Sequence, residues 1–206
     1  MLAKVQWELH GAKTGNCLRA AIALEEAGMN YQPVHVDLAH GEQRTDRHLA
    51  LNLTGKVPVL VEYREGEPPF VLSQSMAIML YAANQCPGVL MPIDTRLTAV
   101  ATERLFLVAV DLIAPNHAAF FLRKLSERQA ATKLDQETSS RLDWLERILE
   151  QHAYLAGSSF SLADISAYTF VAHLRSDALA NRPKLAAWYA RIGARDGVRR
   201  GHYAFS

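Results

Sequence analysis

Three places in the first part of the chain combine an unusual backbone demand with polar groups, and the first is Val57-Pro58. Proline at the start of the apolar run that follows cannot donate a backbone hydrogen bond. A cis bond here would turn the amide and carbonyl of Val57 outward, free to pair with an extended peptide. An ordinary trans proline entering a strand is the alternative, and the residue pair by itself favours it.

The second place is Gln74-Ser75, at the beginning of a predicted helix. A helix N-terminus presents unpaired amides and the positive end of the helix dipole, so a carboxylate can bind the amide and hydroxyl of Ser75. The alternative is that the pair only caps its own helix, which the capping preference of serine favours.

The third place is the turn Lys13-Thr14-Gly15-Asn16-Cys17. Glycine permits a close approach, and the Thr14 hydroxyl, the Asn16 amide and the free amides of the following helix can all donate to an anion such as a thiolate. Taken alone, the turn is better explained as a capped helix start with Cys17 as a small buried residue.

Two alternating periodicities predict the elements that hold these places. Strands are predicted at 4–8, 31–38, 57–63 and 69–72, and helices at 16–27, 45–52 and 73–85, the last capped by Ser73. The predicted order is therefore β-α-β-α-β-β-α.

Beyond a linker at 87–94 the strand pattern disappears. Apolar residues recur at helical spacing from Leu97 to Leu112, before Pro115 kinks or ends that helix, and again over 142–149. Ser161 to Asp164 has the form of a capping box, and Pro183 suits the first turn of a last helix. We predict an α+β protein with a mixed domain over 1–86 and an all-helical domain over 95–206.

Composition narrows the function classes. The 22 basic and 21 acidic residues give a net charge of +1, which argues against nucleic acid or an anionic membrane as partner. No stretch reaches the roughly 18 apolar residues of a membrane helix, and the N-terminus lacks the apolar core of a signal peptide, so we expect a cytoplasmic protein. Cys17 and Cys86 form neither a C-x-x-C pair nor a metal spacing, so we expect no metal.

The sequence resembles the cytosolic glutathione transferase superfamily over nearly its full length. Four motifs in order carry the resemblance: 41–44 (GEQR), 49–60 (LALNLTGKVPVL), 72–78 (LSQSMAI) and 161–165 (SLADI). The resemblance implies a thioredoxin-like N-terminal domain that binds glutathione, followed by an all-α helical bundle that shapes the pocket of the second substrate.

Site residues follow from the same resemblance. It implies that Val57 precedes a cis Pro58 and pairs with the cysteinyl part of glutathione, and that Gln74 and Ser75 hold its γ-glutamyl end. Arg44, with Gln43 and Lys56, would neutralise the glycine carboxylate.

The thiol-activating residue of relatives lies on the first strand-helix turn. Here Thr14 stands at the serine position and Asn16 at the cysteine position, so both depart from the usual pattern, and Cys17 is one place beyond. Thr14-Gly15-Asn16 is similar to the Thr-Pro-Asn turn of some bacterial members. We therefore assign activation to Thr14 and Asn16, with Cys17 the remaining candidate.

The implied function is a glutathione transferase of detoxification that works as a homodimer, with glutathione as co-substrate and a small hydrophobic electrophile as partner. Two alternatives stay open: a glutathione-dependent disulfide reductase or peroxidase, and a non-catalytic protein-interaction module. Apolar residues that could line the electrophile pocket are better explained as core: Phe106, Val110, Phe120 and Phe121.

Overall fold

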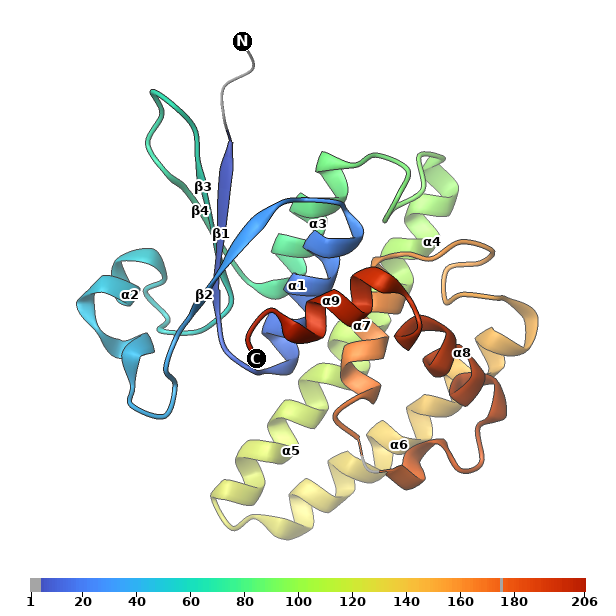
Figure 1. The fold of residues 1–206 in the computed structure, drawn as a ribbon. Coiled ribbons are helices and arrows are strands. Elements are labelled where there is room, and N and C mark those ends of the chain that lie inside the picture. Colours follow the sequence, from blue (N-terminus) through green and yellow to red (C-terminus); the bar gives the residue numbers. More distant parts are fainter. Residues whose placement is uncertain (1–4, 175) are drawn as a thin grey trace. The chain divides into compact units, whose positions relative to one another are not determined.

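A four-stranded mixed sheet organises the first part of the chain (Figure 1). The computed structural model describes residues 5–174 and 176–206. The elements of this part are β1 (Gln6–Gly11), α1 (Gly15–Glu26), β2 (Tyr31–His35), η1 (Glu42–Arg44), α2 (Asp46–Leu51), β3 (Val59–Tyr63), β4 (Phe70–Ser73) and α3 (Ser75–Gln85). The predicted order is confirmed. Lys4, the predicted start of the first strand, lies outside the described residues, and β1 continues to Gly11.

The strands lie in the order β2-β1-β3-β4. β1 pairs with β2 in parallel and with β3 in antiparallel fashion, and β3 pairs with β4 in antiparallel fashion. Helices α1 and α3 lie side by side on one side of the sheet, and α2 lies on the other (Figure 1). The paired residues Leu9 and Leu60 are fully buried, so the core of this unit lies against the central strands.

The last helix of the chain, α9 (Asp196–Tyr203), belongs to the same compact unit as the sheet. That unit holds the chain up to Leu90 together with Arg195–Ser206, whereas the second unit spans Met91–Ala194. Arg195 donates to both carboxylate oxygens of Glu26 at 3.0 and 2.6 Å, and Arg200 donates to Glu25 at 2.6 Å. The C-terminal segment, expected in the helical domain, therefore packs on α1 instead, because these ion pairs and a glycine-lined helix contact hold it there.

The second unit contains only helices. They are α4 (Thr95–Phe106), η2 (Leu107–Ile113), α5 (Ala114–Lys124), α6 (Arg128–Gln151), α7 (Leu162–Val171), η3 (Ser176–Leu179) and α8 (Pro183–Gly193). Pro115 does not end the first of them. It lies in the first turn of α5, directly after the wider π-helical turns of η2, where a residue without an N–H is tolerated.

The predicted capping box begins α7. The carboxylate of Asp164 accepts hydrogen bonds from the amide and the hydroxyl of Ser161 at 2.9 and 3.0 Å. It also accepts from the Leu155 amide at 3.0 Å and from Trp188 Nε1 at 2.8 Å. These hydrogen bonds connect a loop, the start of α7 and the middle of α8. Trp188 is fully buried, so the connection lies in the core of this unit.

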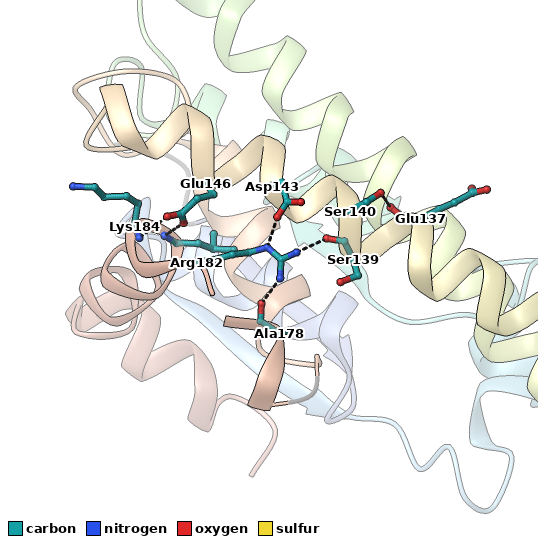
Figure 2. A network of polar contacts seen from close by, with 9 residues as sticks. Glu137, Ser139, Ser140, Asp143, Glu146, Ala178, Arg182 and Lys184 are labelled. Carbon is teal, nitrogen blue, oxygen red and sulfur yellow. Dashed lines mark hydrogen bonds and ion pairs between the residues drawn. The ribbon is translucent and has the colours of Figure 1, made fainter. Parts of the chain in front are cut away.

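A polar network joins α6 to the beginning of α8 (Figure 2). The Arg182 guanidinium donates to Asp143 at 2.8 Å and to the carbonyls of Ala178 and Ser139 at 2.7 and 2.8 Å. Glu146 accepts from the amides of Lys184 and Leu185, two of the unpaired donors that begin α8. These contacts fix the position of α8 against α6.

One continuous helical stretch spans residues 95–124. It contains an 18-residue window of mean hydropathy 1.8, long and apolar enough to cross a membrane by length and composition, although a core helix of a soluble protein passes the same test. No unbroken apolar run marks this stretch in the sequence, because charged residues such as Arg104 and Asp111 interrupt it. The four apolar candidates expected in the core are exposed instead: Phe106 (59%), Val110 (59%), Phe120 (47%) and Phe121 (60%).

Candidate functional site

The sheet register brings the three chemical places of the sequence to one end of the sheet. His10 near the end of β1 pairs with Val59 at the start of β3, and Val59 pairs with Ser73 at the end of β4. The turn that begins α1 follows β1, Val57-Pro58 precedes β3, and Gln74-Ser75 follows β4. Residues that are far apart in the sequence therefore lie together, because three strands begin or end at the same end of the sheet.

The Val57–Pro58 peptide bond is cis, as the resemblance implied. Val57 is half-buried, and within the described part of the chain its amide and carbonyl have no hydrogen-bond partner. A backbone amide and carbonyl that stay unpaired next to a sheet can pair with an extended peptide, as an added strand does.

Two side chains from α2 and its C-terminal end hold the loop before this bond. The carbonyl of Lys56 accepts from His48 Nε2 at 3.1 Å and from Asn52 Nδ2 at 2.8 Å, and both side chains are buried. Sequence reasoning missed these two residues. Their spacing of four, which places them on one face of a short helix just before the proline motif, is the signal that could have found them.

The three predicted residues for a ligand carboxylate lie around the same loop. The Arg44 guanidinium is exposed and lies 3.5 Å from the Thr54 carbonyl, and Lys56 is exposed. Gly55 has a φ of 59°, and a Cβ there would lie 2.9 Å from both Arg44 Nη1 and the Gln43 carbonyl. Only glycine at position 55 therefore lets this loop approach η1 so closely. The Oε1 atom of Gln43 is buried without a hydrogen-bond partner among the described residues.

The N-terminus of α3 begins at Gln74 and not at Ser73, so the predicted cap is wrong. Ser73 is the last residue of β4, where its pairing with Val59 keeps it in the sheet. Gln74 is the N-cap residue with a φ of 73°, an uncommon backbone for a residue with a side chain, and its side chain makes no capping hydrogen bond. Such a backbone outlier at a helix N-terminus without a side-chain cap points to a binding function.

The turn at the start of α1 has the expected donors. Thr14 is the N-cap residue, and its Oγ1 accepts from the Cys17 amide at 3.3 Å, which leaves the hydroxyl hydrogen able to donate elsewhere. The Cys17 side chain is fully buried, and its sulfur accepts from the Ala12 amide at 3.4 Å. Burial raises the pKa of the Cys17 thiol, so this residue lacks the properties of a nucleophile.

Arg19 joins the two helix N-termini, and sequence reasoning missed it. It is 3% exposed, and its Nη1 donates to Asn16 Oδ1 at 2.8 Å and to Ser75 Oγ at 3.0 Å. A single cation inside the apolar helix 17–24 is the signal that could have found it.

This end of the sheet therefore offers two helix N-termini, an open backbone edge and exposed cations. It suits an extended ligand with more than one negative group. Within 5–174 and 176–206 no group of three or more His, Cys, Asp or Glu side chains is placed to hold a metal ion.

Two family models match the chain. The glutathione S-transferase N-terminal domain matches residues 9–84, and the glutathione S-transferase C-terminal domain matches residues 129–191.

Individual proteins agree with these models. The disulfide-bond oxidoreductase YfcG of Escherichia coli is 30% identical over 196 residues, which cover 91% of this chain and 90% of that protein. A glutathione transferase family member from Pseudomonas fluorescens, solved with two glutathione bound, superposes with a TM-score of 0.86 over 96% of this chain and 92% of that one, at 21% identity. A glutathione transferase homologue from Sulfitobacter, solved with bound glutathione, has a TM-score of 0.80 at 27% identity, over 96% of this chain and 97% of that one. With these matches in both units, the chain belongs to the cytosolic glutathione S-transferase superfamily.

Proposed function

We propose that the protein is a glutathione transferase that activates the glutathione thiol for attack on a small hydrophobic electrophile. The observation that carries the proposal is the cis Val57–Pro58 bond at the same sheet end as the N-termini of α1 and α3. The Sulfitobacter homologue, solved with bound glutathione at 27% identity, supports the choice of ligand.

In this proposal the tripeptide lies along the backbone of Val57. Its γ-glutamyl carboxylate binds the amides at Gln74 and Ser75, where the helix dipole favours negative charge. Its glycine carboxylate lies near Arg44, with Gln43 and Lys56 beside it. The unpartnered Oε1 of Gln43 is then able to accept from a ligand donor.

The chemical task is to hold the thiol as a thiolate. A free cysteine thiol has a pKa of about 8.5, so only a few per cent is ionised at neutral pH. Donors from Thr14 and Asn16, together with the free amides of α1, favour the charged form. The thiolate then attacks an electrophilic carbon, a C–S bond forms, and the leaving group departs with its electron pair.

A second candidate reaction is glutathione-dependent disulfide reduction, which the likeness to the disulfide-bond oxidoreductase YfcG favours. Neither Cys17, which is buried, nor a C-x-x-C pair supplies the protein with its own dithiol. The glutathione thiolate would attack the substrate disulfide, forming a mixed disulfide and releasing the first substrate thiolate. A second glutathione thiolate would then attack the mixed disulfide, forming glutathione disulfide and releasing the second substrate thiolate.

Calorimetry and an activity panel test these proposals on the wild-type protein. Binding of glutathione and a lowered thiol pKa, seen by thiolate absorbance, are expected for either reaction. A chlorinated aromatic, an organic hydroperoxide and a small disulfide then separate conjugation, peroxidase and reductase activities. A protein that is not retained on glutathione-agarose would instead be a non-catalytic interaction module.

We also propose a cytoplasmic homodimer. Exposed apolar side chains on α4 and α5, such as Phe106 and Phe121, support the proposal, because apolar surface of this kind is typical of a protein–protein interface. Light scattering after size exclusion is expected to give twice the chain mass of 22.9 kDa, and a monomer would reject the dimer.

A further inference from the structure

Arg19 lies between two residues of the proposed glutathione site and contacts both. It is nearly inaccessible to solvent, and one nitrogen, Nη1, donates to Asn16 and to Ser75. Burial lowers the pKa of Arg19 to about 10, which leaves the guanidinium charged at neutral pH.

A guanidinium has five N–H donors and no acceptor, so it selects how each neighbour is oriented. Asn16 presents Oδ1 to Arg19 at 2.8 Å. The reverse orientation would place the amide N–H₂ of Asn16 against another donor. The contact therefore directs Nδ2, the donor end of the half-buried Asn16 amide, away from Arg19.

The same reasoning applies to Ser75. Its Oγ accepts from Arg19 at 3.0 Å, so its hydroxyl hydrogen points elsewhere and is able to donate to a ligand. The cation also polarises this hydroxyl toward donation. Asn16 and Ser75 both become donors because their acceptor atoms are engaged by one buried cation.

We propose that Arg19 is a positioning residue that orients Asn16 as a donor to the glutathione thiolate and Ser75 as a donor to the γ-glutamyl carboxylate. This inference rests on the proposed function. One residue that is not expected to touch the ligand thus links thiol activation to tripeptide binding.

Arg19→Met removes the donors and keeps a stem of similar length. We expect the pKa of the bound glutathione thiol to rise by about one unit and the Kd of glutathione to rise about tenfold. Arg200→Met is the matched control, because Arg200 pairs with Glu25 at the other end of α1 and is expected to leave both values unchanged.

A double-mutant cycle separates this role from general destabilisation. If Arg19 acts on the thiol through Asn16, Arg19→Met has no further effect on the thiol pKa once Asn16→Ala is present. Its effect on the Kd persists in that background, because it acts through Ser75. Additive effects of the two substitutions on the thiol pKa would overturn the inference.

Asn16→Asp keeps the experiment decisive should Arg19→Met fail to fold. The carboxylate keeps its contact with Arg19 but has no N–H to offer, so we expect a folded protein with a raised thiol pKa. An unchanged thiol pKa in this variant, or in folded Arg19→Met, would overturn the inference while the proposed function stands. Wild-type protein that does not bind glutathione would overturn both.

Discussion

In the proposed site the Thr14 hydroxyl has two roles. Its oxygen accepts from the Cys17 amide and so caps α1, while its hydrogen remains able to donate to an anion. Serine keeps both roles and alanine keeps neither, so Thr14→Ser is the matched control for Thr14→Ala.

We predict that Thr14→Ala raises the pKa of bound glutathione by about one to two units, each worth about 1.4 kcal/mol, while its Kd changes little. Titration of thiolate absorbance measures the first quantity and calorimetry the second. Thr14→Ser is the control and keeps the wild-type thiol pKa. An unchanged titration in Thr14→Ala would eliminate Thr14 as the activator.

Arg44 is the exposed cation that we propose for the glycine carboxylate of glutathione. We predict that Arg44→Ala raises the Kd of glutathione about tenfold at low ionic strength and less in high salt, because exposed charge pairs are screened. Calorimetry at two salt concentrations measures this. Arg47→Ala is the control, because Arg47 is also exposed and lies in α2, three residues further along the chain. An unchanged affinity for glutathione in Arg44→Ala would reject the assignment of Arg44 to the glycine carboxylate.

Cys17 is predicted to be unreactive in the native protein. Burial raises the pKa of the Cys17 thiol above that of an exposed thiol, so in alkaline solution the folded protein keeps a proton that the unfolded chain has released. The stability from this buried thiol is fully present below the pKa of the unfolded thiol and is lost as the pH rises through the higher folded value. At neutral pH we expect iodoacetamide to label Cys86, which is partly exposed, before Cys17, as read by mass spectrometry. Equal native rates would contradict the burial of Cys17.

At the scale of elements, four helix N-termini of this protein differ in what their first amides bind. Those of α7 and α8 are satisfied by the carboxylates of Asp164 and Glu146, as Figure 2 shows for Glu146 and the Lys184 amide. That of α3 has no side-chain cap, and that of α1 has only the Thr14 hydroxyl. In the proposed site the N-termini of α1 and α3 bind a ligand, whereas the carboxylate-bound N-termini of α7 and α8 stabilise the fold.

We predict that Asp164→Ala destabilises the protein by about 3 kcal/mol, because the Trp188 and Leu155 N–H donors would be left buried and unpaired. Asp164→Asn retains an acceptor oxygen and costs less. Denaturant unfolding gives both values. The control is Asp135→Ala, whose ion pair with Arg123 is about half exposed, and an equal loss there would contradict this role of Asp164.

At the scale of the whole molecule, the chain returns to its first unit at the end. A Cβ on Gly201 would lie 2.7 Å from Ile22 Cγ1 and 3.0 Å from the Ile22 backbone nitrogen, so α9 packs directly on α1. The N-terminal domain is therefore completed by residues from the C-terminus.

We predict that Gly201→Ala destabilises the protein by about 2 kcal/mol, because the Ile22 backbone cannot move aside and α9 must shift from α1. Thermal or denaturant unfolding measures the loss. Tyr203→Ala, on the exposed side of the same helix, is the control. A stability of Gly201→Ala equal to the wild type would show that α9 does not contribute to the first unit.

The amino-acid sequence predicts the order of the elements up to Gln85, because the alternation of strand and helix periodicity is local. It also located the helix cap at Ser161 to Asp164, because a capping box needs only residues close together in the chain. Element ends were less well determined, as Ser73 and Gln74 illustrate, because strand pairing competes with helix capping at that point.

Contacts between residues far apart in the chain follow from the tertiary fold. The contact of Arg19 with Ser75 spans 56 positions, and the return of Arg195 to Glu26 spans 169, so no local pattern contains either. The cis state of the Val57–Pro58 bond followed from resemblance and not from the residue pair, whose local preference is trans. Burial and pairing depend on the whole fold, and for that reason a cation inside an apolar helix acquires a function only once its distant partners are in place.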